Sequence, residues 1–191
     1  MSDNRWVYWF FDDEQTEGAT FQLRAQRTVI GDAPPPPHAR VARVQSATPL
    51  EAPRARLRGV AQHHQYTDAA QKRDLESVSH AELAPGPSTV AVLIPMRKND
   101  AWWALSQDQR NAHFAGQGHT AIGRRYADRI YRKLYHSRYL EHGSGCDFLT
   151  YFEFDEGHTS DFRALLDVLR ATAEWAYVDL EYEIWMTKAH E

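Results

Sequence analysis

The stretch HTAIGRRYADRIYRKLYH (residues 119–136) decides the fold, because the sequence pattern changes within it from helix to strand. Its first part continues a helical stretch that begins with the capping residue Ser106 and has an acidic residue in its first turn. We expect this helix to reach about Tyr126. From about Arg129 to Ser137 the residues favour a short strand. The stretch therefore predicts a helix followed by a strand that turns back along it.

The segments on both sides of this stretch extend the alternation of strands and helices. Residues 88–96 (STVAVLIPM) form an apolar, β-branched run that predicts a buried strand, and residues 146–154 (CDFLTYFEF) predict another. Residues 161–172 carry apolar side chains at helical spacing. Residues 178–187 alternate apolar and polar side chains, which predicts a strand with one buried face. The resulting order, βαββαβ, is that of a ferredoxin-like unit in the α+β class.

The first half of the chain repeats this plan in part. It contains three predicted strands and one predicted helix, in that order, at residues 5–11, 20–30, 56–63 and 67–78. Four consecutive prolines, at positions 34–37, predict an extended connection at the surface. We therefore expect a truncated N-terminal ferredoxin-like half (residues 1–86) packed on a complete C-terminal half (residues 87–191).

Composition limits the class of protein. The chain has 191 residues, 22 Lys and Arg against 26 Asp and Glu, and a net charge of -4, so it lacks the broad basic surface of a nucleic-acid-binding protein. The single cysteine, Cys146, excludes an intramolecular disulfide and a multi-cysteine metal site. The start has no basic region before its apolar run, and no stretch approaches about 18 uninterrupted apolar residues. We expect a cytoplasmic protein without a membrane segment.

His119 and Arg132 are the most informative pair of candidate site residues. A neutral imidazole can ligate iron, and a guanidinium, which stays charged, can hold an anion opposite that iron. On one continuous helix, their separation of thirteen residues would place them roughly 20 Å apart and facing different ways. If the helix ends between them, both side chains can point into one cleft. Arg132, Leu134 and His136 would then share one face of the strand.

The stretch 119–136 resembles the haem-binding segment of chlorite dismutases and of their relatives, the coproheme decarboxylases. Four further segments resemble the short-chain chlorite dismutases: LRGVAQHHQYTDAAQK (57–72), LIPMRKNDAWW (93–103), DFLTYFEF (147–154) and LRATAEWAYVDLEYEI (169–184). The resemblance implies a haem b enzyme of the dimeric α/β-barrel type that converts the small anion chlorite to chloride and dioxygen. It also implies a homodimer.

The resemblance assigns a role to each site residue. His119 matches the proximal histidine that ligates the haem iron, and Glu174 matches the carboxylate that accepts the other ring N–H of that histidine. Arg132 matches the distal, catalytic arginine. Four more residues match positions beside the cofactor: Trp102, Trp103, Tyr66 and Lys98. The resemblance implies that the two tryptophans lie near the haem, one of them lining it, and that Tyr66 and Lys98 contact its propionates.

Other functions remain open. One alternative is another haem enzyme on the same scaffold, either peroxidase-like or a coproheme decarboxylase. The decarboxylases usually have an uncharged residue at the position of Arg132, so the arginine favours a dismutase. A second alternative is a non-catalytic haem-binding or regulatory protein, or an α+β barrel without a cofactor. Where short-chain relatives often have a distal glutamine, this chain has Ser79 or His80.

Overall fold

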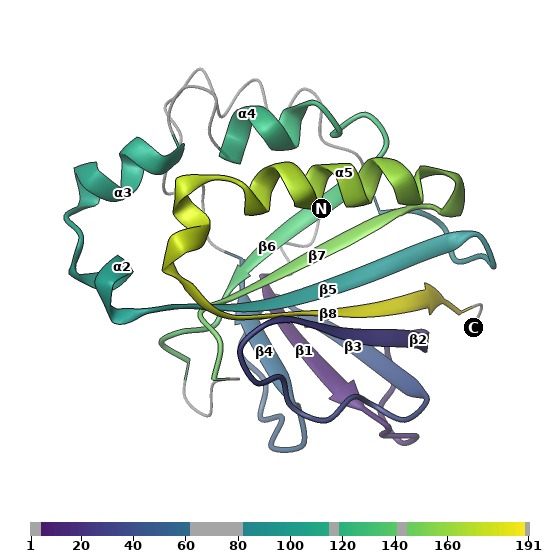
Figure 1. The fold of residues 1–191 in the computed structure, drawn as a ribbon. Coiled ribbons are helices and arrows are strands. Elements are labelled where there is room, and N and C mark those ends of the chain that lie inside the picture. Colours follow the sequence, from purple (N-terminus) through teal and green to yellow (C-terminus); the bar gives the residue numbers. More distant parts are fainter. Residues whose placement is uncertain (1–4, 62–81, 115–118, 141–144, 190–191) are drawn as a thin grey trace.

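A computed structural model describes residues 5–61, 82–114, 119–140 and 145–189. The strands of these residues form one closed antiparallel barrel in the order β1-β3-β2-β8-β5-β7-β6-β4 (Figure 1). They are β1 (Trp6–Phe11), β2 (Ala19–Ile30), β3 (Arg40–Ser46), β4 (Leu57–Val60), β5 (Thr89–Lys98), β6 (Tyr131–His136), β7 (Phe148–Asp155) and β8 (Val178–Lys188). The protein is thus of the α+β class, with a barrel at its centre.

The C-terminal half has the predicted βαββαβ order. Its strands are arranged as β8-β5-β7-β6, which is the strand order of a ferredoxin-like unit. Helices α2 (Asp100–Ala104), α3 (Gln107–Phe114) and α4 (His119–Arg124) come between β5 and β6. Helix α5 (Thr159–Arg170) lies between β7 and β8, flanked by the 3-10 turns η1 (Glu156–His158) and η2 (Ala173–Tyr177). The helical stretch predicted from Ser106 to about Tyr126 appears in the described residues as α3 and α4, and residues 115–118 between them lie outside the described part of the chain.

The N-terminal half repeats the strand order of the C-terminal half. Its strands are arranged as β4-β1-β3-β2. This order matches β8-β5-β7-β6 when β1 to β4 are compared in turn with β5 to β8. The predicted strands at 5–11, 20–30 and 56–63 are present as β1, β2 and β4, whereas β3 was not predicted. The helix predicted at 67–78 lies outside the described residues. The division near residue 86 stays a prediction.

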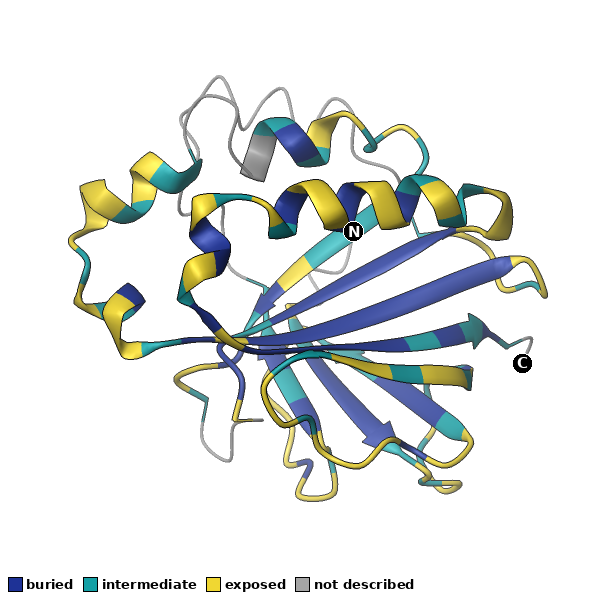
Figure 2. Cartoon of the chain, viewed as in Figure 1, coloured by how far each residue is buried: buried dark blue, intermediate teal, exposed yellow. Residues whose placement is uncertain are grey.

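The two faces of the barrel wall are buried in different ways. Alternate residues of each strand fill the interior, where the core includes Trp9, Phe21, Leu93, Tyr151 and Ile184. On the outer face, α5 covers β5, β7 and β8 through four buried side chains: Phe162, Leu165, Leu166 and Leu169. Figure 2 shows β5 and β7 almost entirely buried for this reason.

The prediction that β8 has only one buried face is wrong. Leu180, Tyr182, Ile184 and Met186 fill the barrel interior as expected. The middle of the alternating polar face is also buried, because it lies beneath α5, and Glu181 and Glu183 are 0% and 1% exposed.

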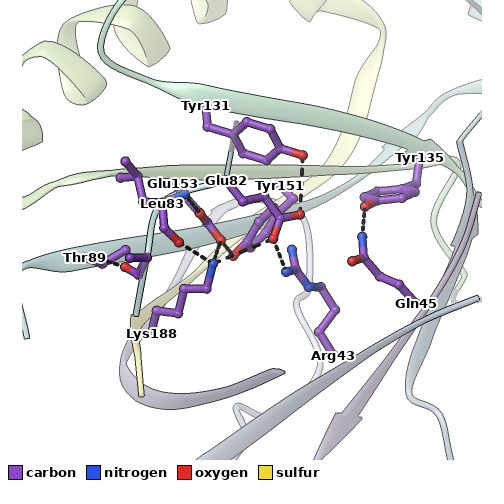
Figure 3. A network of polar contacts seen from close by, with 11 residues as sticks. Arg43, Gln45, Glu82, Leu83, Thr89, Tyr131, Tyr135, Tyr151, Glu153 and Lys188 are labelled. Carbon is purple, nitrogen blue, oxygen red and sulfur yellow. Dashed lines mark hydrogen bonds and ion pairs between the residues drawn. The ribbon is translucent and has the colours of Figure 1, made fainter. Parts of the chain in front are cut away.

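One end of the barrel interior holds a polar cluster of Arg43, Glu82, Tyr151, Glu153 and Lys188 (Figure 3). Arg43 Nη2 lies 2.5 Å from Glu82 Oε2, and Lys188 Nζ lies 2.9 Å from Glu153 Oε1. The Tyr151 hydroxyl donates to Glu153. Two cations thus balance two carboxylates, which is the condition for burying such charges.

None of the described helices is long and apolar enough to cross a membrane.

Candidate functional site

The outer face of β6 carries the candidate site. Tyr135 points into the barrel core, so the alternating residues Arg132, Leu134 and His136 lie on the outer face, as predicted. The Arg132 guanidinium lies 6.0 Å from the ring centroid of Phe152, its partner on β7, and the His136 ring meets Phe148 edge-on. Leu134 is 37% exposed, so this part of the wall is apolar but not fully covered by the described residues.

Arg132 faces helix α4. A Cβ atom placed on Gly123 would lie 3.6 Å from Arg132 Nη1, so the guanidinium packs against the helix at the one position that has no side chain. Position 119 is one helical turn before Gly123 and therefore lies on the same face of the helix. Helix α4 ends at Arg124 and β6 starts at Tyr131, so the predicted helix end between His119 and Arg132 is confirmed. The side chain of His119 lies outside the described part of the structure.

Arg132 stays cationic in this environment. Burial lowers the pKa of Arg132 to about 10, and the negative charge of Glu174 opposes that shift. The guanidinium is thus protonated at neutral pH. It also follows that Glu174, which comes from η2, lies within electrostatic reach of Arg132.

Glu174 forms a buried ion pair with Lys98. Lys98 Nζ lies 2.9 Å from Glu174 Oε1 and 3.2 Å from the Glu174 carbonyl oxygen. The two side chains are 1% and 6% exposed. Burial lowers the pKa of Lys98, while Glu174 opposes the shift. The pair fixes both the carboxylate and the main chain of Glu174, and the propionate contact of Lys98 stays a prediction.

The tryptophan pair lies on α2. The helix is capped by Asn99, whose side chain accepts a hydrogen bond from the main-chain N–H of Trp102. Trp102 is 1% exposed, and its ring lies 4.6 Å from Lys98 Nζ. Its Nε1 is buried and has no hydrogen-bond partner among the described residues. A buried indole N–H in this situation is a donor suited to an acceptor on a bound molecule.

Trp103 has a different environment, which centres on Asp147. The Trp103 Nε1 donates to Asp147 Oδ2 at 3.3 Å, and the Arg138 guanidinium lies 4.0 Å from the centre of the indole. Asp147 also accepts from Arg138 Nη1 at 2.8 Å and from the main-chain N–H of Lys98 at 2.7 Å. Sequence reasoning missed both Asp147 and Arg138. An acid directly before an apolar strand was the available signal for Asp147.

Some predicted residues cannot be located. Tyr66, Ser79 and His80 lie outside the described residues. The described side chains include no group of three or more His, Cys, Asp or Glu that could hold a metal ion. Cys146 is buried, and burial raises the pKa of its thiol to about 11, which agrees with an inert role.

Comparisons with known proteins point to one family. The sequence profile of the chlorite dismutase family matches residues 2–189. A dimeric chlorite dismutase from Nitrobacter winogradskyi is similar in structure at 36% identity, over 96% of this chain and 99% of that one, with a TM-score of 0.78. A mutant chlorite dismutase from Candidatus Nitrospira defluvii is similar at 25% identity, over 88% of this chain and 73% of that one, with a TM-score of 0.64.

A curated relative, the chlorite dismutase of Ideonella dechloratans, is 31% identical over 119 residues. The match covers 62% of this chain but only 38% of that relative, so this chain corresponds to well under two thirds of its length. The profile match along nearly the whole sequence is decisive: the chain belongs to the chlorite dismutase family.

Proposed function

We propose that this protein is a haem b enzyme that converts chlorite to chloride and dioxygen. The observation that carries the proposal is the position of Arg132. Its guanidinium lies against α4 at Gly123, on the helix face that includes position 119 and within electrostatic reach of Glu174. The match to the chlorite dismutase family supplies the reaction.

The residues of the site fit a haem. The outer face of β6 offers an incompletely covered apolar wall at Leu134, and Gly123 leaves room beside Arg132. The buried Nε1–H of Trp102 could donate a hydrogen bond to a haem carboxylate. His119 would ligate the iron through one ring nitrogen. The haem, when bound, would supply the redox chemistry.

Glu174 would act through His119. An ionised carboxylate that accepts the second ring N–H of a ligating histidine fixes the orientation of the ring and makes it a stronger donor to the metal. Lys98 supports this role because its ammonium, 2.9 Å from Glu174 Oε1, compensates the buried negative charge. The pair would therefore hold the Glu174 carboxylate in one orientation.

Arg132 would bind chlorite and hold it in place. The guanidinium remains protonated at neutral pH, so it acts through its charge and its N–H donors rather than by transferring a proton. Its partial burial strengthens its attraction for an anion, because the local dielectric constant is lower than that of water. In the overall reaction both Cl–O bonds of chlorite break and one O–O bond forms, and Arg132 would keep the anion in place throughout.

A homodimer is part of the proposal. The Nitrobacter winogradskyi relative, which is dimeric, matches this chain over 99% of its own length. We expect the chain to elute as a dimer in size-exclusion chromatography with light scattering, and elution as a monomer would contradict this expectation. The cytoplasmic compartment stays a prediction.

The test is oxygen release from chlorite by the haem-loaded protein. We expect His119→Ala to lose the ligand field of the wild-type haem. We expect Arg132→Ala to keep haem but to release oxygen about 10²-fold more slowly, or to lose activity sooner. Arg132→Lys is the matched control, because it keeps the charge but not the planar fork. Undiminished and equally durable turnover by Arg132→Ala would refute the role of the arginine.

The same preparation separates the alternative functions. A coproheme decarboxylase would consume coproheme and peroxide and would tolerate Arg132→Ala. A non-catalytic haem-binding protein would show a Soret band without turnover. A barrel without a cofactor would show no Soret band that depends on His119.

A further inference from the structure

A second buried network lies between α5 and β8. At its centre is Arg170, near the end of α5, whose Nη2 is 2.6 Å from Glu181 Oε1 and 2.6 Å from Glu183 Oε1. Its Nε also donates to Glu181 Oε1, at 3.0 Å. Burial opposes the charge of Arg170, but the hydrogen bonds to the two carboxylates raise its pKa. One guanidinium thus holds two carboxylates that are almost fully buried.

Each carboxylate receives a second donor from a tryptophan. Trp175 Nε1 donates to Glu181 Oε2 at 2.8 Å, and Trp185 Nε1 donates to Glu183 Oε2 at 2.7 Å. The network therefore has two arms of the same chemistry that share Arg170. A buried carboxylate needs such partners, because an unsatisfied charge is costly to remove from water.

Among the described residues, the arm through Glu181 is the one that contacts the neighbour of Glu174 in η2. Trp175 directly follows Glu174 in η2, and its ring lies 5.4 Å from Lys98 Nζ, the partner of Glu174. The other tryptophan, Trp185, packs instead against Phe162, with ring centroids 5.4 Å apart. The arm through Glu181 thus fixes the residue next to Glu174, while the arm through Glu183 does not.

We propose that Glu181 and Arg170 are positioning residues that act through Trp175 to hold Glu174 in place for His119. This inference rests on the proposed function, because it gives Glu174 the role of partner to the haem-ligating histidine. Lys98 restrains Glu174 from the side of β5, and the indole of Trp175 restrains η2 from the side of β8. The carboxylate is then held from two directions, as precise orientation of a histidine ligand requires.

The two arms supply a matched experiment. Trp175→Phe and Trp185→Phe each remove one indole donor from one buried carboxylate, so both should lower thermal stability. We expect Trp175→Phe alone to raise the Fe(III)/Fe(II) midpoint potential of the haem-loaded protein, because a misplaced Glu174 makes His119 a weaker donor to ferric iron. Chlorite turnover should fall about tenfold in the same variant. Trp185→Phe should leave the potential at its wild-type value.

A second pair of variants repeats the comparison without changing side-chain size. Glu181→Gln should raise the potential, and Glu183→Gln should not. Glu174→Gln is the reference that gives the potential expected when the acceptor loses its charge. Equal shifts in both arms would mean a merely structural network and would overturn the proposal, as would the absence of a shift in Trp175→Phe.

The reference variant also separates the two levels of inference. If Glu174→Gln shifts the potential but Trp175→Phe and Glu181→Gln do not, the proposed function stands and the positioning role is refuted. If Glu174→Gln has no effect on the potential, the assignment of Glu174 itself has failed, and the positioning role fails with it.

Discussion

Replacing Lys98 with methionine should destabilise the fold strongly. The change removes an ammonium whose side chain is 1% exposed and leaves Glu174, 6% exposed, without its charged partner at 2.9 Å. Breaking a buried ion pair in this way costs about 3–5 kcal/mol of unfolding free energy. For a protein of this size, 1 kcal/mol changes Tm by about 2–4 °C, so we expect Tm to fall by about 6–20 °C.

Urea and thermal unfolding of the full chain, prepared without haem, would measure this effect apart from the cofactor. The double variant Lys98→Met/Glu174→Met removes both charges and should recover most of the lost stability, because two well-packed apolar groups can replace a buried pair. A loss below about 1 kcal/mol in the single variant, the level of an exposed pair, would refute the argument. Simple addition of the two single-variant losses would refute it as well.

Three further predictions concern Gly123, Asp12 and Cys146. Gly123→Ala should be tolerated, because its Cβ would lie 3.6 Å from Arg132 Nη1. Gly123→Leu should displace the guanidinium and reduce chlorite turnover. Equal turnover in both variants would contradict this prediction. Burial opposes ionisation of Asp12, but hydrogen bonds from the main chain of residues 38–40 lower its pKa. The ionised Asp12 carboxylate therefore stabilises the folded state fully above the pKa of an unfolded aspartate. This stabilisation is lost as the pH falls through the lower folded-state pKa. Asp12→Asn should be less stable than wild type in urea at neutral pH, and the difference should shrink in acid. Cys146, with a pKa of about 11, should react with iodoacetamide only after unfolding, so rapid labelling of the native protein would be unexpected.

The change from helix to strand between His119 and Arg132 could be predicted because it is encoded locally. The amphipathic spacing ends before Ile130, and a short run with strand propensity follows.

Strand β3 escaped prediction because of Arg43. Strand patterns place apolar residues on the buried face, but Arg43 occupies an interior position, 3% exposed and paired with Glu82. The partner comes from a segment 39 residues away, so no local pattern reveals it. The prediction that the second face of β8 is solvated failed for the same reason. Glu181 and Glu183 suggest a solvated face, and their burial depends on Arg170 of α5 together with the indole donors of Trp175 and Trp185.

Within the part of the chain that the structure describes, the pairing between β4 and β6, the strand that carries Arg132, is the shortest in the barrel. Strand β6 pairs with β7 along its whole length, whereas among the described residues it meets β4 only where His136 faces Val60. Main-chain amides of β6 that face β4 should therefore exchange hydrogen with solvent sooner than those that face β7. In the described ranges, β6 is therefore held to the barrel mainly through β7, and we expect substitutions in β4, which is remote in sequence, to affect the strand that carries Arg132 through this short pairing.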